Sequence, residues 1–173
     1  MRADAERNRT KVIEAAMAAF AQDGLTVSVA EIGRRAGVGT GTVSRHFPTK
    51  DSLYAAIVLA KVEEIVSHAR TLMAASPAGD AFYEFFAYMV EQATTNRGLA
   101  EALSGGGFDV ESAATGTDQD LEQIEQSLLD RAQEAGAVRQ DVTRADVKAL
   151  LGACVAAPDR ARMIEIVTAG LRR

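Results

Sequence analysis

Between Ile32 and Leu53 the sequence reads IGRRAGVGTGTVSRHFPTKDSL. Glycines at both ends of the turn 37–39 separate two short segments. We expect a helix over 29–36 that ends at the first of these glycines, and a second helix over 40–47. Pro48 ends the second helix because the residue before a proline disfavours the helical conformation. This part of the chain therefore predicts two short helices joined by a tight turn.

Capping patterns mark where helices begin on both sides of the turn. Ser28 and Glu31 form a capping box in which the Ser28 hydroxyl accepts from the Glu31 amide and the Glu31 carboxylate reaches back. Thr49 caps a long helix over 50–75, and Asp51 in its first turn complements the helix dipole. The two short helices are thus followed by a long one.

A further helix precedes the pair. Ile13, Ala16, Met17 and Phe20 fall at helical spacing and form one apolar stripe, and Gly24 can take the left-handed conformation that ends a helix. Two short helices joined by a glycine turn and supported by a preceding helix describe a helix-turn-helix unit. Such a unit suits DNA binding when the outward residues of its second helix are small or polar.

The second short helix meets this requirement, with Val43 and Phe47 as its apolar anchors. Lys50 is placed to reach a phosphate, and Arg2, Arg7 and Arg9 could contact DNA from a loose N-terminal arm. Arg45 is our first choice for a contact to guanine or phosphate, and His46 either contacts a phosphate or simply ends the helix in solvent. The candidate DNA contacts are Thr26, Ser28, Thr40, Gly41, Thr42, Ser44, Arg45, His46 and Lys50.

The remainder of the chain shows helical periodicity and no strand pattern, which predicts an all-α fold. A stretch with four glycines, 105–116, is expected to be a loop. Thr117 with Asp120 and Thr143 with Asp146 give two more capping patterns. The expected helices after the long one cover 80–95, 97–104, 118–135, 144–157 and 159–171.

Composition supports this fold class and excludes several others. Of 173 residues, 47% are apolar and 25% charged, as in ordinary globular proteins. The longest apolar run, 149–157, is far shorter than the roughly 18 residues of a membrane span. The single Cys154 excludes an intrachain disulfide and a cysteine-cluster metal site. We expect a cytoplasmic protein with no membrane association, no metal and no cofactor.

Charge is unevenly distributed along the chain. Residues 1–51 carry eight basic and six acidic side chains, a net charge of +2, whereas residues 52–173 carry 11 basic and 18 acidic, a net charge of −7. A polyanionic partner would therefore meet the first part of the chain, although random scatter over a solvated surface explains so small an excess equally well.

The run from Ile32 to Leu53, with its order of helix, turn, helix, Phe-Pro and Lys, resembles the helix-turn-helix signature of TetR-family transcriptional regulators. The resemblance covers about residues 9–58. It implies a DNA-binding head at 1–51 and a helical effector-binding and dimerisation body at 52–173. It also implies a homodimeric repressor of a palindromic operator, so the expected partners are double-stranded DNA, a small-molecule effector and a second copy of the chain.

In the family, the last two helices usually pair with their copies. Here these are 144–157 and 159–171, whose apolar stripes fit either this role or an ordinary intrachain core. The candidate interface residues are Val147, Leu150, Leu151, Cys154, Met163, Ile164, Val167 and Leu171.

Three residues depart from the usual family pattern. Gly39 stands where a Ser or Thr often caps the recognition helix, Thr40 where Lys or Arg is common, and Ser44 where many relatives have a phosphate-contacting Tyr. We therefore expect no tyrosine–phosphate contact at residue 44 and fewer charged contacts overall.

An aromatic cluster is the candidate effector site. Five of the nine aromatic residues lie within 82–88, and few cations lie near them in sequence, which disfavours a strongly anionic ligand. The hypothesis is a pocket for a small, largely apolar effector, with plain core as the alternative. The candidate lining residues are Phe82, Phe85, Phe86, Met89, Phe108, Leu121 and Ile124.

Two other functions compete with this interpretation. A helical protein-interaction module without operator specificity would bind without a sequence preference and is the main alternative. An enzyme is not expected: the glycine-rich turn follows a helix rather than a strand, and Ser44 and His46 face different directions with no orienting carboxylate nearby.

Overall fold

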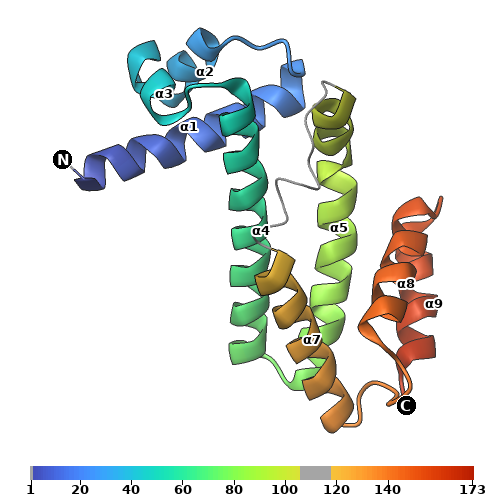
Figure 1. Cartoon of the computed structure of the whole chain (residues 1–173). Coiled ribbons are helices and arrows are strands. Elements are labelled where there is room, and N and C mark those ends of the chain that lie inside the picture. The colour runs from blue at the N-terminus through green and yellow to red at the C-terminus, as the bar shows by residue number, and fades with distance from the viewer. Residues whose placement is uncertain (1, 106–117) are drawn as a thin grey trace. The chain divides into compact units, whose positions relative to one another are not determined.

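The computed structural model describes residues 2–105 and 118–173. All regular elements in these residues are helices: α1 (Arg2–Asp23), α2 (Val29–Ala36), α3 (Thr40–His46), α4 (Lys50–Ala75), α5 (Ala78–Gly105), α7 (Asp118–Glu134), α8 (Arg144–Ala156) and α9 (Arg160–Leu171) (Figure 1). An isolated bridge between Val138 and Arg172 is the one β-type pairing found in this part of the chain. The predicted all-α fold class is confirmed.

Two compact units make up the described chain. The head unit comprises residues 2–62 with 97–105, and the body unit comprises 63–96 with 118–173. The division falls within α4 because Leu53 and Ile57, near its start, are buried in the head core. The functional assignment of residues 1–51 and 52–173 to DNA binding and to effector binding stays a prediction.

The head unit packs α1, α2, α3 and the start of α4 around one apolar core (Figure 1). Ile32, Val43 and Leu53 supply one fully buried side chain each from three different helices. Gly24 and Gly37, at φ +74° and +67°, take the left-handed conformation expected after α1 and α2. Thr49 caps α4 by accepting from the Ser52 amide at 3.0 Å, as predicted.

Several sequence predictions about local structure are corrected. Residues from Arg2 onward are helical, so the expected loose arm is instead the first turns of α1. The Ser28 hydroxyl accepts from the Glu31 amide at 3.2 Å, but the Glu31 carboxylate is bonded to two arginines rather than to the Ser28 amide. The helices expected at 80–95 and 97–104 are one continuous helix, α5, because nothing between them breaks it.

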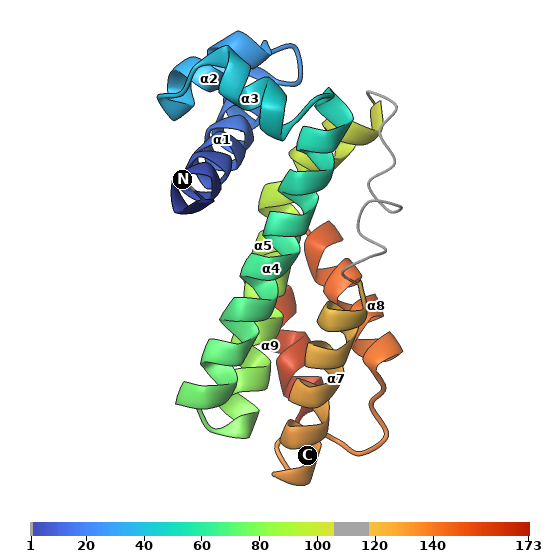
Figure 2. The ribbon, with the colours of Figure 1, turned by 60° about the vertical axis from the view of Figure 1, so that its left-hand side comes forward.

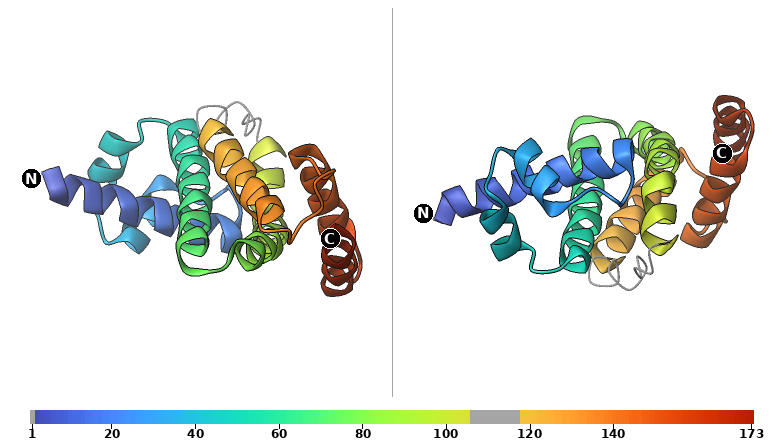
Figure 3. Two further views of the ribbon diagram at one scale, coloured as in Figure 1. Left: turned by 90° about the horizontal axis from the view of Figure 1, so that it is seen from below. Right: turned by 90° about the horizontal axis from the view of Figure 1, so that it is seen from above.

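The body unit is a layered helical bundle. Figures 1 and 2 show the second half of α4 beside α5, with α7 lying against both. Seen end on, α8 and α9 lie on the far side of α5 and α7 from α4 (Figure 3). The core is built from Phe82, Phe86, Val90, Leu128 and Leu129, all at most 4% exposed. The full capping box of Thr143 with Asp146 is present at the start of α8.

The C-terminal end of α9 is tied to the connection between α7 and α8. The Arg139 amide donates to the Leu171 carbonyl at 3.0 Å. The Tyr83 hydroxyl donates to the Ala137 carbonyl at 2.9 Å, and the Arg172 guanidinium lies 4.7 Å from the centre of the Tyr83 ring. These contacts fix α8 and α9 against α5. The predicted Thr117 cap and Phe108 lie outside the described residues.

No helix in the described residues combines the length and apolar character that crossing a membrane requires.

Candidate functional sites

The outer side of α3 is a small polar surface on a rigid support. Thr40, Gly41, Ser44 and Arg45 are exposed, Thr42 and His46 are half-buried, and Val43 and Phe47 are buried in the head core. Gly39 begins the helix without a side-chain cap, as its sequence predicts. The surface is free of bulky side chains apart from Arg45, which suits close approach to a groove of DNA.

Close packing of α2 on α3 depends on Gly33. A Cβ atom at this position would lie 3.1 Å from the Val38 carbonyl oxygen and 3.2 Å from a Val43 methyl carbon, both tighter than ordinary contacts. The turn between the helices is closed by the Val38 amide, which donates to the Gly33 carbonyl at 2.9 Å. The close approach of α3 and the turn to Gly33 therefore fixes the orientation of α3 relative to α2.

The arginines of α2 and α3 differ in their partners. Arg34 makes a bidentate pair with the Glu31 carboxylate at 2.7 and 2.8 Å, and Arg35 bridges Glu31 and Asp23 at 2.8 and 2.6 Å. These two arginines lower the Glu31 pKa to about 2. Arg45 makes no hydrogen bond or ion pair with any described residue. It is therefore the cation of the helix-turn-helix whose donors are free for an incoming anion.

Lys50 lies close to the other predicted phosphate contacts although it is distant in sequence. Its ammonium donates to the Leu25 carbonyl at 3.4 Å, which brings it beside the exposed Thr26 and Ser28 at the start of α2. Two of the arginines predicted to form an N-terminal arm are engaged within the head. Arg7 pairs with Asp4, and Arg9 lies 5.8 Å from the centre of the Phe47 ring. Sequence inspection missed these contacts because they depend on α1 being helical from its second residue.

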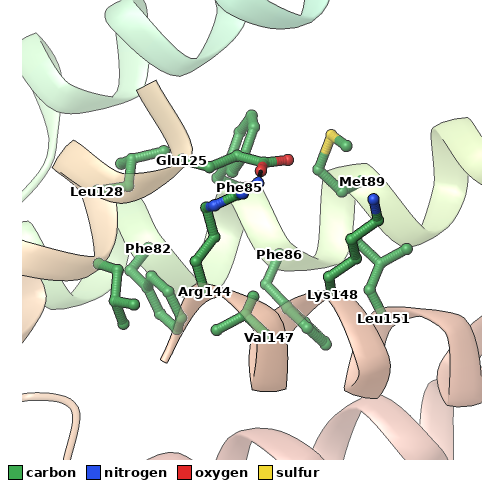
Figure 4. Close-up of a pocket in the computed structure, with 11 residues that line it drawn as sticks. Phe82, Phe85, Phe86, Met89, Glu125, Leu128, Arg144, Val147, Lys148 and Leu151 are labelled. Carbon is green, nitrogen blue, oxygen red and sulfur yellow. Dashed lines mark hydrogen bonds and ion pairs between the residues drawn. The ribbon is translucent and has the colours of Figure 1, made fainter. Parts of the chain in front are cut away.

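The body unit contains an apolar pocket between α5, α7 and α8 (Figure 4). The empty space among its side chains is about 420 Å³, which includes the part open to solvent, and the pocket is narrow. Its lining residues are Phe82, Phe85, Phe86, Met89, Glu125, Leu128, Leu129, Arg144, Val147, Lys148 and Leu151.

Four of the predicted pocket residues line this cavity: Phe82, Phe85, Phe86 and Met89. Leu121 and Ile124 are half-buried against the body core but are not part of the lining. No sequence signal assigned the α8 residues to the pocket, although Arg144, Val147, Lys148 and Leu151 share one helical face at spacings of three and four. Their role became visible only once α8 was placed against α5.

A charged group lies at one side of the pocket. The Arg144 guanidinium contacts the Glu122 carboxylate at 2.9 Å and the Glu125 carboxylate at 3.4 Å. Burial raises the Glu125 pKa above its ordinary value, against the opposing effect of its hydrogen bond to Arg144. The expectation of few cations near the aromatic cluster is therefore wrong in three dimensions, because α8 brings Arg144 and Lys148 to it.

The predicted interface residues on α8 and α9 fall into three groups. Cys154, Val167 and Leu171 are buried in the body core of the single chain, where burial also raises the Cys154 pKa. Val147 and Leu151 line the pocket. Leu150, Met163 and Ile164 are half-buried and pack against the body core. All eight thus contribute to intrachain packing, which the sequence had left open as an alternative.

The opposite face of α8 and α9 is uncovered by other described helices (Figure 3). It carries the exposed small residues Ala149, Gly152 and Ala153 on α8 and Gly170 on α9. Ile166, also on α9, is 53% exposed and is the only large apolar side chain found exposed in residues whose burial is described. We call this set the outer face of α8 and α9.

Comparisons with known proteins show the family to which this arrangement belongs. Residues 12–57 match the model for bacterial regulatory proteins of the tetR family, and residues 77–173 match the model for the C-terminal domain of SbtR-like transcriptional regulators. A TetR transcription regulatory protein of Mycobacterium vanbaalenii is 46% identical, with 99% of each chain covered and a TM-score of 0.87. The chain belongs to the TetR family of transcriptional regulators.

Other TetR-family structures share the fold. A TetR transcriptional regulator of Streptomyces coelicolor is 30% identical, with 95% of this chain and 98% of that chain covered and a TM-score of 0.77. A gamma-butyrolactone receptor described as ArpA-like has the same fold at 23% identity, with 98% and 90% covered and a TM-score of 0.68. The TetR assignment confirms the predicted family and the prediction of a regulator rather than an enzyme. The family is that of DNA-binding regulators with a ligand-binding C-terminal domain.

Proposed function

We propose that the chain is a homodimeric repressor that binds a palindromic operator and is released by a small, largely apolar effector. The proposed DNA binding rests on the exposed surface of α3, where Arg45 has no partner in the described residues. Its neighbours Thr40 and Ser44 are short enough to let α3 enter a major groove. In this proposal Arg45 contacts guanine or a phosphate, and Lys50 with the Thr26–Ser28 segment contacts the backbone phosphates.

The proposed DNA binding is tested by comparing the affinities of two arginine variants for operator DNA. Arg45→Ala removes the free cation of α3, whereas Arg70→Ala removes an exposed arginine of the body unit on α4. We expect Arg45→Ala to weaken binding by roughly tenfold or more, because a good base or phosphate contact is worth about 1–3 kcal/mol. Arg70→Ala is expected to bind like the parent chain. Equal affinity of Arg45→Ala and the parent would overturn the proposed docking.

The homodimer is proposed to form through the outer face of α8 and α9. Support comes from the exposure of Ile166 and of several small residues on α8 and α9, since small residues allow a second pair of helices to pack closely. A two-fold interface of this kind would hold two heads for two half-sites, about 34 Å or a multiple apart. The second copy would cover Ile166 and exclude water from the face.

Sedimentation of two charged variants tests this interface. Ile166→Asp places a carboxylate in the proposed contact, whereas Ala161→Asp places one at an exposed position of the same helix that faces the groove toward α5. Ile166→Asp is expected to sediment as a monomer at concentrations where Ala161→Asp is still a dimer. Two dimers, or two monomers beside a dimeric parent, would contradict the choice of face.

Effector release is proposed to act through the body pocket. A ligand can shift the chain from its DNA-binding arrangement only by binding another arrangement more tightly. The pocket lies between α5, α7 and α8. The second half of α4 packs in the same body unit, and α4 is one unbroken helix that begins at Lys50, shortly after α3. A change in the packing of α4 is therefore the proposed route from effector to head.

A further inference from the structure

The chemistry of the body pocket restricts the effector more narrowly than its apolar walls alone. Three phenylalanines and Met89 form the wall contributed by α5, while every charged group comes from α7 or α8. Figure 4 shows the Glu125–Arg144 pair on one side and the Lys148 side chain reaching from α8 toward Met89. A ligand in this pocket would therefore meet rings with one part and cations with another.

The cations are not equally engaged. Arg144 is shared between two carboxylates, and its contact to Glu125, at 3.4 Å, is longer than its contact to Glu122, at 2.9 Å. Lys148, one helical turn after Arg144, makes no hydrogen bond or ion pair with the described residues and is exposed. The described lining thus carries two cations and one carboxylate, Glu122 outside the lining pairs with Arg144, and the ammonium of Lys148 is available to a ligand.

From this arrangement we infer that the pocket takes a small aromatic acid as a monoanion, with its ring among Phe82, Phe85 and Phe86 and its carboxylate on Lys148 and Arg144. The inference deepens the proposed function and rests on the pocket being the effector site. A flat ring suits the narrow space between phenylalanine side chains, where offset or edge-to-face contacts are favourable. The carboxylate would replace the longer Glu125 contact to Arg144, leaving the shorter pair with Glu122 in place.

A cationic ligand is disfavoured by the same geometry. Among the described lining residues Glu125 is the one carboxylate, and Arg144 already contacts it. A second cation beside Glu125 would face Arg144 and Lys148 at close range. A neutral ligand would leave Lys148 without a partner and so would gain only the apolar contacts. The expected affinity order is therefore anion, neutral molecule, cation.

Three ligands of nearly equal shape test this order: benzoate, benzamide and benzamidinium. Their binding to the full chain is measured by isothermal titration calorimetry at neutral pH and constant ionic strength. We expect benzoate to bind up to about fivefold more tightly than benzamide, since a partly exposed ion pair is worth up to about 1 kcal/mol. Benzamide binding as tightly as benzoate, benzamidinium binding best, or no binding of any of the three up to about 10 mM would overturn the inference.

Variants identify the charges responsible. Lys148→Gln is expected to abolish the preference for benzoate over benzamide, and Lys11→Gln, a matched change at an exposed lysine of the head unit, to preserve it. Glu125→Gln removes the carboxylate that competes for Arg144, so it is expected to strengthen benzoate binding. Because misfolding cannot strengthen binding, this variant keeps the test decisive even where Lys148→Gln is destabilised. An unchanged preference in Lys148→Gln would contradict the inference.

Operator binding by the unliganded chain separates this inference from the proposed function. A chain that binds operator DNA but shows no preference for benzoate overturns only the ligand class. A chain that prefers benzoate but binds no operator supports the ligand class and overturns the proposed function instead.

Discussion

The head and body units use charged side chains in different ways. On α2 of the head, Arg34 and Arg35 pair with Glu31, three and four residues away. In the body, Arg144 pairs with Glu122 and Glu125, which lie 22 and 19 residues earlier on another helix, and the group lines a pocket. In the head, the Glu31 pairs lie within α2 and the Arg35–Asp23 pair joins α2 to α1, whereas the pairs between α7 and α8 couple the packing of two helices to the contents of the pocket.

Truncation of one buried side chain in each core compares the contributions of the two units to stability. Phe86→Ala is expected to destabilise the chain by about 3–5 kcal/mol, because Phe86 is 2% exposed and its loss leaves a large cavity. Val43→Ala in the head removes less volume, and we expect a smaller loss of stability. Urea unfolding followed by circular dichroism measures both. A Phe86→Ala chain as stable as the parent would contradict the assignment of this ring to the body core.

Backbone conformation in the head predicts the next largest effect. Gly37→Ala forces a side chain into the left-handed region at φ +67°, and we expect it to cost about 1–2 kcal/mol. Gly41→Ala is the matched control, because a Cβ atom there meets nothing within 4 Å and the backbone is helical. The control is expected to be neutral or to stabilise by up to about 1 kcal/mol. Thermal unfolding of the two variants checks the difference, and equal melting temperatures would contradict it.

The smallest expected effect concerns acid stability of the head. The Glu31 pKa is lowered from 4.5 to about 2 in the folded chain, so the stabilisation by its charged form is present above about pH 4.5 and is lost as the pH falls toward 2. Glu31→Gln should therefore melt at a lower temperature than the parent near neutral pH. The gap should close by about pH 2. A melting-temperature difference that does not change with pH would show that the charge of Glu31 is not responsible.

The head could be predicted from sequence in more detail than the body for a physical reason. Its defining signals are local: the glycine after α2, the proline after α3 and the cap at Thr49 all act on neighbouring residues. The candidate DNA contacts followed because their helix is anchored by Val43 and Phe47 four residues apart. What sequence did not reveal was the pairing of Arg34 and Arg35, which decides that Arg45 is the free cation.

In the body, the periodicity of each helix was visible, but its neighbours were not. The stripe of α8 was expected to face either a second chain or the chain's own core. Its placement against α5 sends Val147 and Leu151 to the pocket together with Arg144 and Lys148. The number of helices was also misjudged at α5, where nothing after residue 95 breaks the helix. Contacts between helices far apart in sequence are not encoded by any short motif.

The most direct test of the central claim is fluorescence anisotropy of the full chain on the DNA upstream of its own gene, with excess nonspecific competitor at about 150 mM salt. The account predicts tight binding that resists the competitor, with two chains per site. Weak binding that the competitor or added salt abolishes, on this DNA and on operators selected from random sequence, would contradict it. The main alternative would then be a helical interaction module without operator specificity.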